Sequence, residues 1–127
     1  MSRRRDDSGI GAVTTALMMP ALLVMIMLVV QAGLYWHAHQ RASAAADQAA
    51  ASAATPTGTE QGGRQAAQMF LDGAPIEGSW VQVVRGPEEV QATVGGTAPQ
   101  LVPGISFAVE ATATAPGERF IPEDERR

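Results

Sequence analysis

The sequence predicts an α+β fold, in which a long N-terminal helix carries a small antiparallel sheet of about three strands. Two features of the 127-residue chain lead to this prediction. Residues 8–40 contain no Asp, Glu, Lys or Arg, and the second half of the chain alternates apolar and polar residues between turns that contain Gly and Pro. Outside a membrane-spanning helix, roughly 85–90 residues remain, which is enough for one small core but not for two.

The centre of the apolar run predicts a transmembrane helix. Residues 16–30 (ALMMPALLVMIMLVV) contain no polar side chain. At ~1.5 Å per residue, residues 12–34 extend over about 34 Å as a helix, whereas a hydrocarbon core is about 30 Å thick. We therefore expect residues 10–36 to cross a membrane. We also expect a helix kink at Pro20, because proline cannot donate the backbone hydrogen bond to Ala16.

Charged and aromatic residues predict the orientation of this helix. Residues 3–5 are all arginine, whereas Arg41 is the only Lys or Arg within about 20 residues beyond the span. Tyr35 and Trp36 stand together at the outer end, where amphipathic rings settle at the level of the lipid headgroups as membrane-interface anchors. We therefore expect residues 1–9 to form a cytoplasmic basic N-terminus and the rest of the chain beyond the helix to be extracytoplasmic.

Two features of this region allow a second interpretation. Residues 42–44 (ASA) resemble a signal-peptide cleavage site, but the apolar region is about twice as long as a usual h-region and ends about ten residues before that site, so we favour an uncleaved anchor. Gln31 is the one polar side chain in the outer part of the span. It either bonds a partner helix or reaches the headgroups, and we favour the headgroups.

Residues 37–54 (HAHQRASAAADQAAASAA) predict a helical stalk that continues the membrane helix, because they lack Pro and Gly and alanine is the strongest helix former. Residues 55–58 (TPTG) are expected to end it. Small side chains recur at spacings of four and three, which lets another backbone approach closely. This stalk packing seam consists of Ala38, Ala42, Ala45, Ala49 and Ala53. The alternative is that the alanines reflect only the composition of an alanine-rich chain.

No residues predict catalysis, a metal site or a cofactor. The chain has no Cys, which removes thiolate chemistry, Cys-ligated zinc and disulfides. His37 and His39 are two residues apart on a helix and project in nearly opposite directions, so they do not form a metal-binding pair. The carboxylates outside the membrane are assigned mostly to turns and solvent-facing positions. The net charge of −4, without a basic stripe, argues against nucleic acid as a partner.

Residues 55–116 predict a small extracytoplasmic α+β head, and residues 117–127 a flexible tail. In chain order we expect a loop over 55–63, a short helix over 64–71, antiparallel strands over 80–84 and 90–94, and a Gly- and Pro-rich connection over 95–104. The clearest alternation comes last. Its apolar face consists of Ile105, Phe107, Val109, Ala111 and Ala113, as in a strand with one buried face.

The order of these features resembles the TadE-like family. The features are residues 9–20 (GIGAVTTALMMP), the apolar span, then residues 40–42 (QRA) and an alanine-rich stretch that contains Asp47. The C-terminal part is loosely similar as well, in residues 101–104 and 109–116. TadE-like proteins are pseudopilin-like membrane proteins encoded with tight-adherence (Flp-type, type IVc) pilus machinery. A long helix with a small head is also a pilin-like layout.

The resemblance implies a place for a prepilin-peptidase site. Family members that resemble true pilins are cut after a glycine and carry a glutamate at the fifth mature position. In this chain the glycine is Gly9, the first mature residue Ile10 and the fifth Thr14, so the glutamate is missing. In pilins that carboxylate is thought to balance the N-terminal ammonium of a neighbouring subunit, and an unpaired charge in lipid is costly. The missing glutamate argues against cleavage of this chain by a prepilin peptidase and against its entry into the core of a pilus filament.

From the resemblance we expect a single-pass protein of a bacterial plasma membrane that works as a pseudopilin or accessory component of a tight-adherence pilus assembly or secretion system. Its expected partners are the lipid bilayer and other pilus-assembly membrane proteins or pseudopilins, contacted through the N-terminal helix. The family implies no catalysis. The alternative function is a membrane-tethered extracytoplasmic binding module unrelated to pili.

Overall fold

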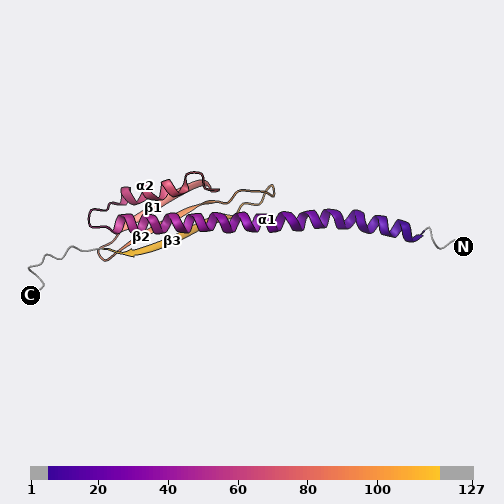
Figure 1. Ribbon diagram of the computed structural model, residues 1–127, viewed down its shortest axis with the longest axis horizontal. Helices are drawn as coiled ribbons and strands as arrows, with labels where there is room; N and C mark the ends of the chain where they lie inside the picture. Colours follow the sequence, from indigo (N-terminus) through magenta and orange to yellow (C-terminus); the bar gives the residue numbers. More distant parts are fainter. Residues whose placement is uncertain (1–5, 118–127) are drawn as a thin grey trace, which may run out of the picture.

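The computed structural model describes residues 6–117 as an elongated molecule, in which one long helix carries a small head on its C-terminal half (Figure 1). The element order is α1 (Asp6–Ala54), α2 (Glu60–Leu71), β1 (Glu77–Arg85), β2 (Glu89–Thr97) and β3 (Ala108–Pro116). The three strands form one antiparallel sheet, so the predicted α+β fold is confirmed. The three N-terminal arginines and residues 118–127 of the expected tail lie outside the described residues.

Helix α1 is continuous through the predicted membrane span and the predicted stalk. It runs through Pro20, and the kink expected there stays a prediction. The helix ends at Ala54, where the Thr55 hydroxyl donates to the carbonyl oxygen of Ser52 (3.0 Å) and the Gly58 N–H donates to that of Thr55 (2.9 Å). The Thr-Pro-Thr-Gly segment therefore stops the helix where the sequence predicts.

The expected loop over 55–63 is wrong in its last four residues, because α2 begins at Glu60. The Thr59 side chain caps this helix by accepting a hydrogen bond from the Gly62 N–H at 3.0 Å. Gly62 and Gly63 resemble a loop by composition but lie in the first turns of the helix. Gly63 faces α1, where a Cβ would lie 2.8 Å from the carbonyl oxygen of Ala49 and 3.1 Å from the Cβ of Ala53. The glycine thus serves a close contact between helices.

The sheet has the order β1-β2-β3, and β1 and β2 extend beyond the predicted strands at both ends. Arg85 pairs with Val90 next to the turn, and Val94 pairs with Ala111 across β2 and β3. Residues 95–97, expected in the connection, belong to β2. A Cβ at Gly95 would lie 2.3 Å from the ring of Trp80, so the glycine makes room for the indole to lie across the strand.

The third strand confirms only the later part of the predicted apolar face. Val109, Ala111 and Ala113 are buried, but Ile105 and Phe107 precede the start of β3 and are 43% and 38% exposed. Gly104 adopts a φ of 84°, which bends the chain before the strand begins. The prediction that Ile105 and Phe107 share the buried face is therefore wrong.

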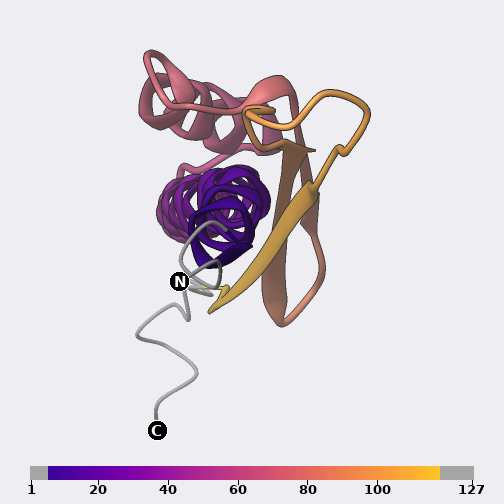
Figure 2. The ribbon, with the colours of Figure 1, turned by 90° about the vertical axis from the view of Figure 1, so that its right-hand side faces the viewer.

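The core lies where α1 meets the sheet and α2. Viewed along α1, the helix sits in the angle between α2 and the sheet (Figure 2). Every buried side chain on α1 beyond Gln31 is an alanine, and the largest fully buried side chains among the described residues are Val90, Val94 and Val109. Alanines on α1 and the small residues Gly63 and Ala67 on α2 let the backbones approach closely, and the sheet adds mainly valines, so the head has a thin, closely packed core.

Candidate functional site

The N-terminal part of α1 exposes nearly all of its side chains. Apart from the half-buried Met27, the large apolar side chains of residues 9–30 are between 45% (Val30) and 71% (Leu17) exposed. Residues 9–30, the part that the head does not cover, extend over about 33 Å at ~1.5 Å per residue, close to the thickness of a hydrocarbon core. In the described part of the chain, this is the one helix long and apolar enough to cross a membrane, and none of its most apolar window is buried. Such a surface is suited to lipid.

The residues of the candidate peptidase site lie at the start of this exposed helix. Ile10 is 66% exposed, and nothing lies within 4 Å of the position of a Cβ on Gly9. The Thr14 hydroxyl donates to the carbonyl oxygen of Ile10 at 2.8 Å, so it is bonded within its own helix. Thr14 therefore supplies neither a charge nor a free donor for a neighbouring subunit.

Gln31 is buried in the protein, and both of our expectations for it are wrong. Its side chain is 3% exposed. Its Nε2 donates to the carbonyl oxygen of Pro99 at 3.0 Å, and its Oε1 accepts from the Leu101 N–H at 2.8 Å. The amide reaches neither a partner helix nor headgroups, because the β2–β3 loop, residues 98–107, folds back along α1 and occupies its surroundings.

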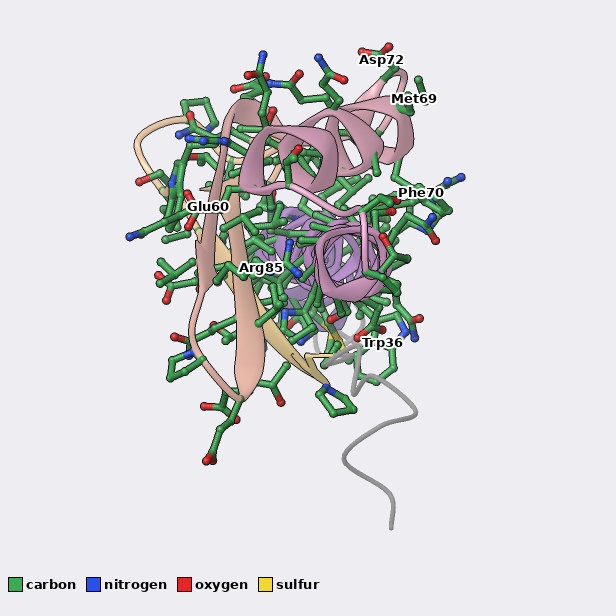
Figure 3. All side chains as sticks on the ribbon, turned by 90° about the vertical axis from the view of Figure 1, so that its left-hand side faces the viewer. Trp36, Glu60, Met69, Phe70, Asp72 and Arg85 are labelled. Carbon is green, nitrogen blue, oxygen red and sulfur yellow. The ribbon has the colours of Figure 1, made fainter. Side chains whose placement is uncertain are left out.

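The two predicted interface anchors have different environments. Tyr35 contacts the ring of Phe107 edge to face at a centroid distance of 6.1 Å and stacks on the ring of His39 at 6.3 Å. Trp36 is 65% exposed and lies on the side of α1 that faces away from α2 (Figure 3). Tyr35 therefore packs against the β2–β3 loop through Phe107, while the Trp36 side chain is exposed on the surface of the molecule.

Within the described side chains, the two histidines lie in different surroundings and belong to no cluster of metal ligands. His37 is exposed, whereas His39 is partly buried and its Nδ1 has no hydrogen-bond partner within the described chain. Among the side chains that the structure describes, residues 9–117, no group of three or more His, Cys, Asp or Glu lies in metal-binding proximity.

The stalk packing seam faces the head of its own chain. Ala38, Ala42, Ala45, Ala49 and Ala53 are all 0% exposed. Helix α2 and strands β2 and β3 cover this face of α1. The opposite face, with Gln40, Arg41, Asp47 and Gln48, is exposed. The seam is thus covered within one chain, and the exposed surfaces of α1 include the apolar residues 9–30, Trp36 and the polar outer face.

Charged residues tie the head together at the end furthest from the exposed apolar helix. The Arg85 guanidinium donates to the carbonyl oxygen of Gly58, and the Arg85 N–H donates to the Glu60 carboxylate at 3.0 Å. Figure 3 shows these two residues at this end of the molecule. Strand β1 is therefore fastened to the start of α2 and to the turn that follows α1.

Sequence reasoning missed the junction between Gln31 and the β2–β3 loop. Two signals point to it in retrospect. Gln31 is a single polar side chain in an apolar run, and residues 90–109 form a second run without any Asp, Glu, Lys or Arg. Charge-free segments far apart in sequence are candidates for the same apolar environment.

The comparisons with known proteins agree with this geometry. The family model described as TadE-like protein matches residues 9–51, which cover the exposed apolar part of α1 and most of the part under the head. Neither a curated protein nor a solved structure matches the chain. The TadE-like resemblance expected from the sequence is therefore confirmed over residues 9–51, which form almost the whole of helix α1.

Proposed function

We propose that this protein is a single-pass membrane component of a tight-adherence pilus system, with an accessory rather than a filament-forming role. The observation that carries the proposal is the TadE-like match on a helix whose first half is apolar and exposed while its second half carries a packed head. The apolar half lies in the bacterial plasma membrane, and the head lies on the extracytoplasmic side. No catalytic step is part of this role.

The accessory role is supported by the chemistry at the start of the helix. A filament-forming pilin uses a carboxylate at the position that Thr14 occupies here, and the Thr14 hydroxyl already bonds its own helix. The alanine seam is occupied by the head, so a partner helix meets the large apolar side chains of residues 9–30. Contacts of this kind suit assembly with other membrane helices by van der Waals packing.

Crosslinking in native membranes tests this proposal. The chain has no Cys, so a photo-crosslinker can be attached at one introduced thiol, with Leu17→Cys on the apolar half and Gln48→Cys on the polar face as the matched control. We expect pilus-assembly membrane proteins to be captured from position 17 and not from position 48. Capture of no pilus component from position 17, in cells that assemble the pilus, favours the membrane-tethered binding module instead.

A pair of fusions tests the orientation. A reporter that is active only after export is expected to be active when it is fused after Arg127, because the arginines at residues 3–5 hold the N-terminus inside. Activity of a cytoplasmic reporter at the same position, with the export reporter silent, reverses the proposed topology.

The intact mass of protein purified from membranes tests processing. If Thr14 does not replace the glutamate of pilins, most of the protein keeps residues 1–9. A mature chain that begins at Ile10 overturns the accessory role in favour of a processed pseudopilin. A chain that begins near Ala45 supports cleavage of a signal peptide.

A further inference from the structure

The β2–β3 loop is the part of the head that reaches furthest along α1 towards the N-terminus (Figure 1). Its backbone contacts Gln31, which precedes the predicted interface anchors Tyr35 and Trp36 along α1 and is therefore nearer to the membrane-spanning part. Four to five residues at ~1.5 Å rise place Gln31 about 6–8 Å closer to the centre of the span than those two rings. If the rings lie at headgroup level, the loop lies at the boundary between headgroups and acyl chains.

The composition of the loop fits that depth. Residues 98–107 (APQLVPGISF) contain no charged side chain, and they lie in the middle of the charge-free run 90–109. Leu101, Ile105 and Phe107 are 40%, 43% and 38% exposed. The loop meets α1 at Gln31 and Tyr35, inside the charge-free residues 8–40, so its exposed apolar side chains lie next to the outer end of the apolar helix, together with the exposed but uncharged Gln100 and Ser106.

The polar backbone of the loop is bonded where it meets α1. Irregular backbone is costly at membrane depth unless protein groups bond its N–H and C=O groups. Gln31 supplies a donor to Pro99 and an acceptor to Leu101 from a single amide, and the Ala98 N–H donates to the carbonyl oxygen of Phe107 at 2.9 Å. A glutamine in a membrane helix, which is itself costly in lipid, is satisfied by the same contacts.

We propose that the β2–β3 loop is a second membrane-contacting element, which inserts Leu101, Ile105 and Phe107 into the lipid leaflet on the head's side while Gln31 clamps its backbone to α1. The inference rests on the membrane anchoring proposed above. It means that the head sits on the bilayer at two points, so its orientation relative to the membrane is set by the loop as well as by the helix.

Site-directed spin labelling of the full-length chain in phosphatidylcholine–phosphatidylglycerol vesicles tests the insertion. Because the chain has no Cys, each variant carries one nitroxide. Leu101→Cys and Ile105→Cys report on the loop, Val24→Cys on the span, and Thr114→Cys on the exposed outer face of β3. The measured quantity is the ratio of collisions with oxygen, which is concentrated in lipid, to collisions with a water-soluble nickel chelate.

We expect oxygen to dominate at positions 24, 101 and 105 and the nickel chelate to dominate at 114. If 101 and 105 behave like 114 while 24 remains in lipid, the loop proposal is overturned and the anchoring stands. If 24 also behaves like 114, the anchoring itself fails. Labels at 101 and 105 that neither reagent reaches indicate a second copy over the loop, which also overturns lipid insertion.

A Gln31→Leu substitution in the Leu101→Cys background tests the clamp. With both hydrogen bonds lost, the loop is expected to move towards water, so the preference for oxygen at 101 falls while that at 24 is unchanged. Gln40→Leu, an exposed position on the same helix, is the matched control and should leave both values unchanged. An unchanged value at 101 in Gln31→Leu shows that Gln31 does not hold the loop at depth.

Discussion

The two halves of helix α1 reverse the usual relation between side-chain size and burial. Over residues 9–30, large apolar side chains are exposed, and Leu17, for example, has an exposed fraction of 71%. Beyond Gln31 the buried side chains are all alanine, and Ala45 is 0% exposed. Hydrophobicity alone therefore indicates that a side chain is shielded from water, but it does not indicate whether lipid or protein surrounds that side chain.

The difference follows from the neighbours of each half. Fluid lipid tails adapt to bulky side chains of any shape, so the first half can be large and irregular. The second half is packed against two rigid layers, in which a sheet and a helix approach α1 closely, and only small side chains fit between the backbones. Gln31 marks the boundary, since it is the first buried residue of α1 from Gly9 onwards and it bonds the head.

The largest expected effect comes from charging the exposed half. Replacing both Leu23 and Ile26 with Asp costs about 3–4 kcal/mol per substitution at the centre of a membrane helix. We expect most of the protein to be released from membranes by alkaline carbonate extraction. The matched control, Gln48→Asp with Ala51→Asp, has the same spacing on the exposed face of the other half and should stay in the membrane fraction. Retention of the Leu23/Ile26 variant would contradict the lipid assignment.

Enlarging the covered half is expected to have the next largest effect. Ala45→Leu or Ala49→Leu should lower the free energy of unfolding of the head by about 1–3 kcal/mol, because the added methyl and methylene groups have no space. Leucine is a strong helix former, so α1 itself should persist. Urea unfolding in detergent micelles measures the change, with the exposed Gln48→Leu as control. Equal stability of all three variants would mean that the seam tolerates bulk and reflects composition alone.

A smaller change tests the contact between α1 and α2. Gly63→Ala gains about 1 kcal/mol of helix propensity but places a Cβ against the Ala49 carbonyl oxygen, so we expect a net loss in the free energy of unfolding. At Gly62 the nearest atom to a Cβ is the Thr59 Oγ1, at 3.2 Å. Gly62→Ala should therefore be neutral or stabilising in the same unfolding measurement. Equal stabilisation by both substitutions would show that the helices can separate without cost.

The smallest effect is expected from trimming the exposed half. Leu23→Ala should change the free energy of unfolding of the head by less than about 0.5 kcal/mol, whereas a leucine in a protein core loses about 2–5 kcal/mol on the same substitution. The measurement is urea unfolding in micelles, as above. A loss in the core range would place Leu23 against protein rather than lipid.

The sequence by itself determined the local features of this protein. The apolar span, the continuous helix to Ala54 and the hairpin at residues 86–88 follow from residue composition, from the absence of helix breakers and from turn residues. The TadE-like resemblance was also readable from the order of features along α1. These properties depend on neighbours within a few turns of helix or a few strand residues, so a local pattern is enough to predict them.

Only the tertiary structure decided which segments that are far apart in the sequence contact each other. The partners of Gln31 are separated from it by 68 and 70 residues, and no local pattern encodes such a contact. Glu60–Gly63 became helical because Thr59 caps the segment and Gly63 fits against Ala49, although their composition favours a loop. Ile105 and Phe107 left the strand because their loop folds back along α1. In each case a long-range contact outweighed the local preference, since burying apolar surface and satisfying backbone hydrogen bonds contribute more free energy than propensity does.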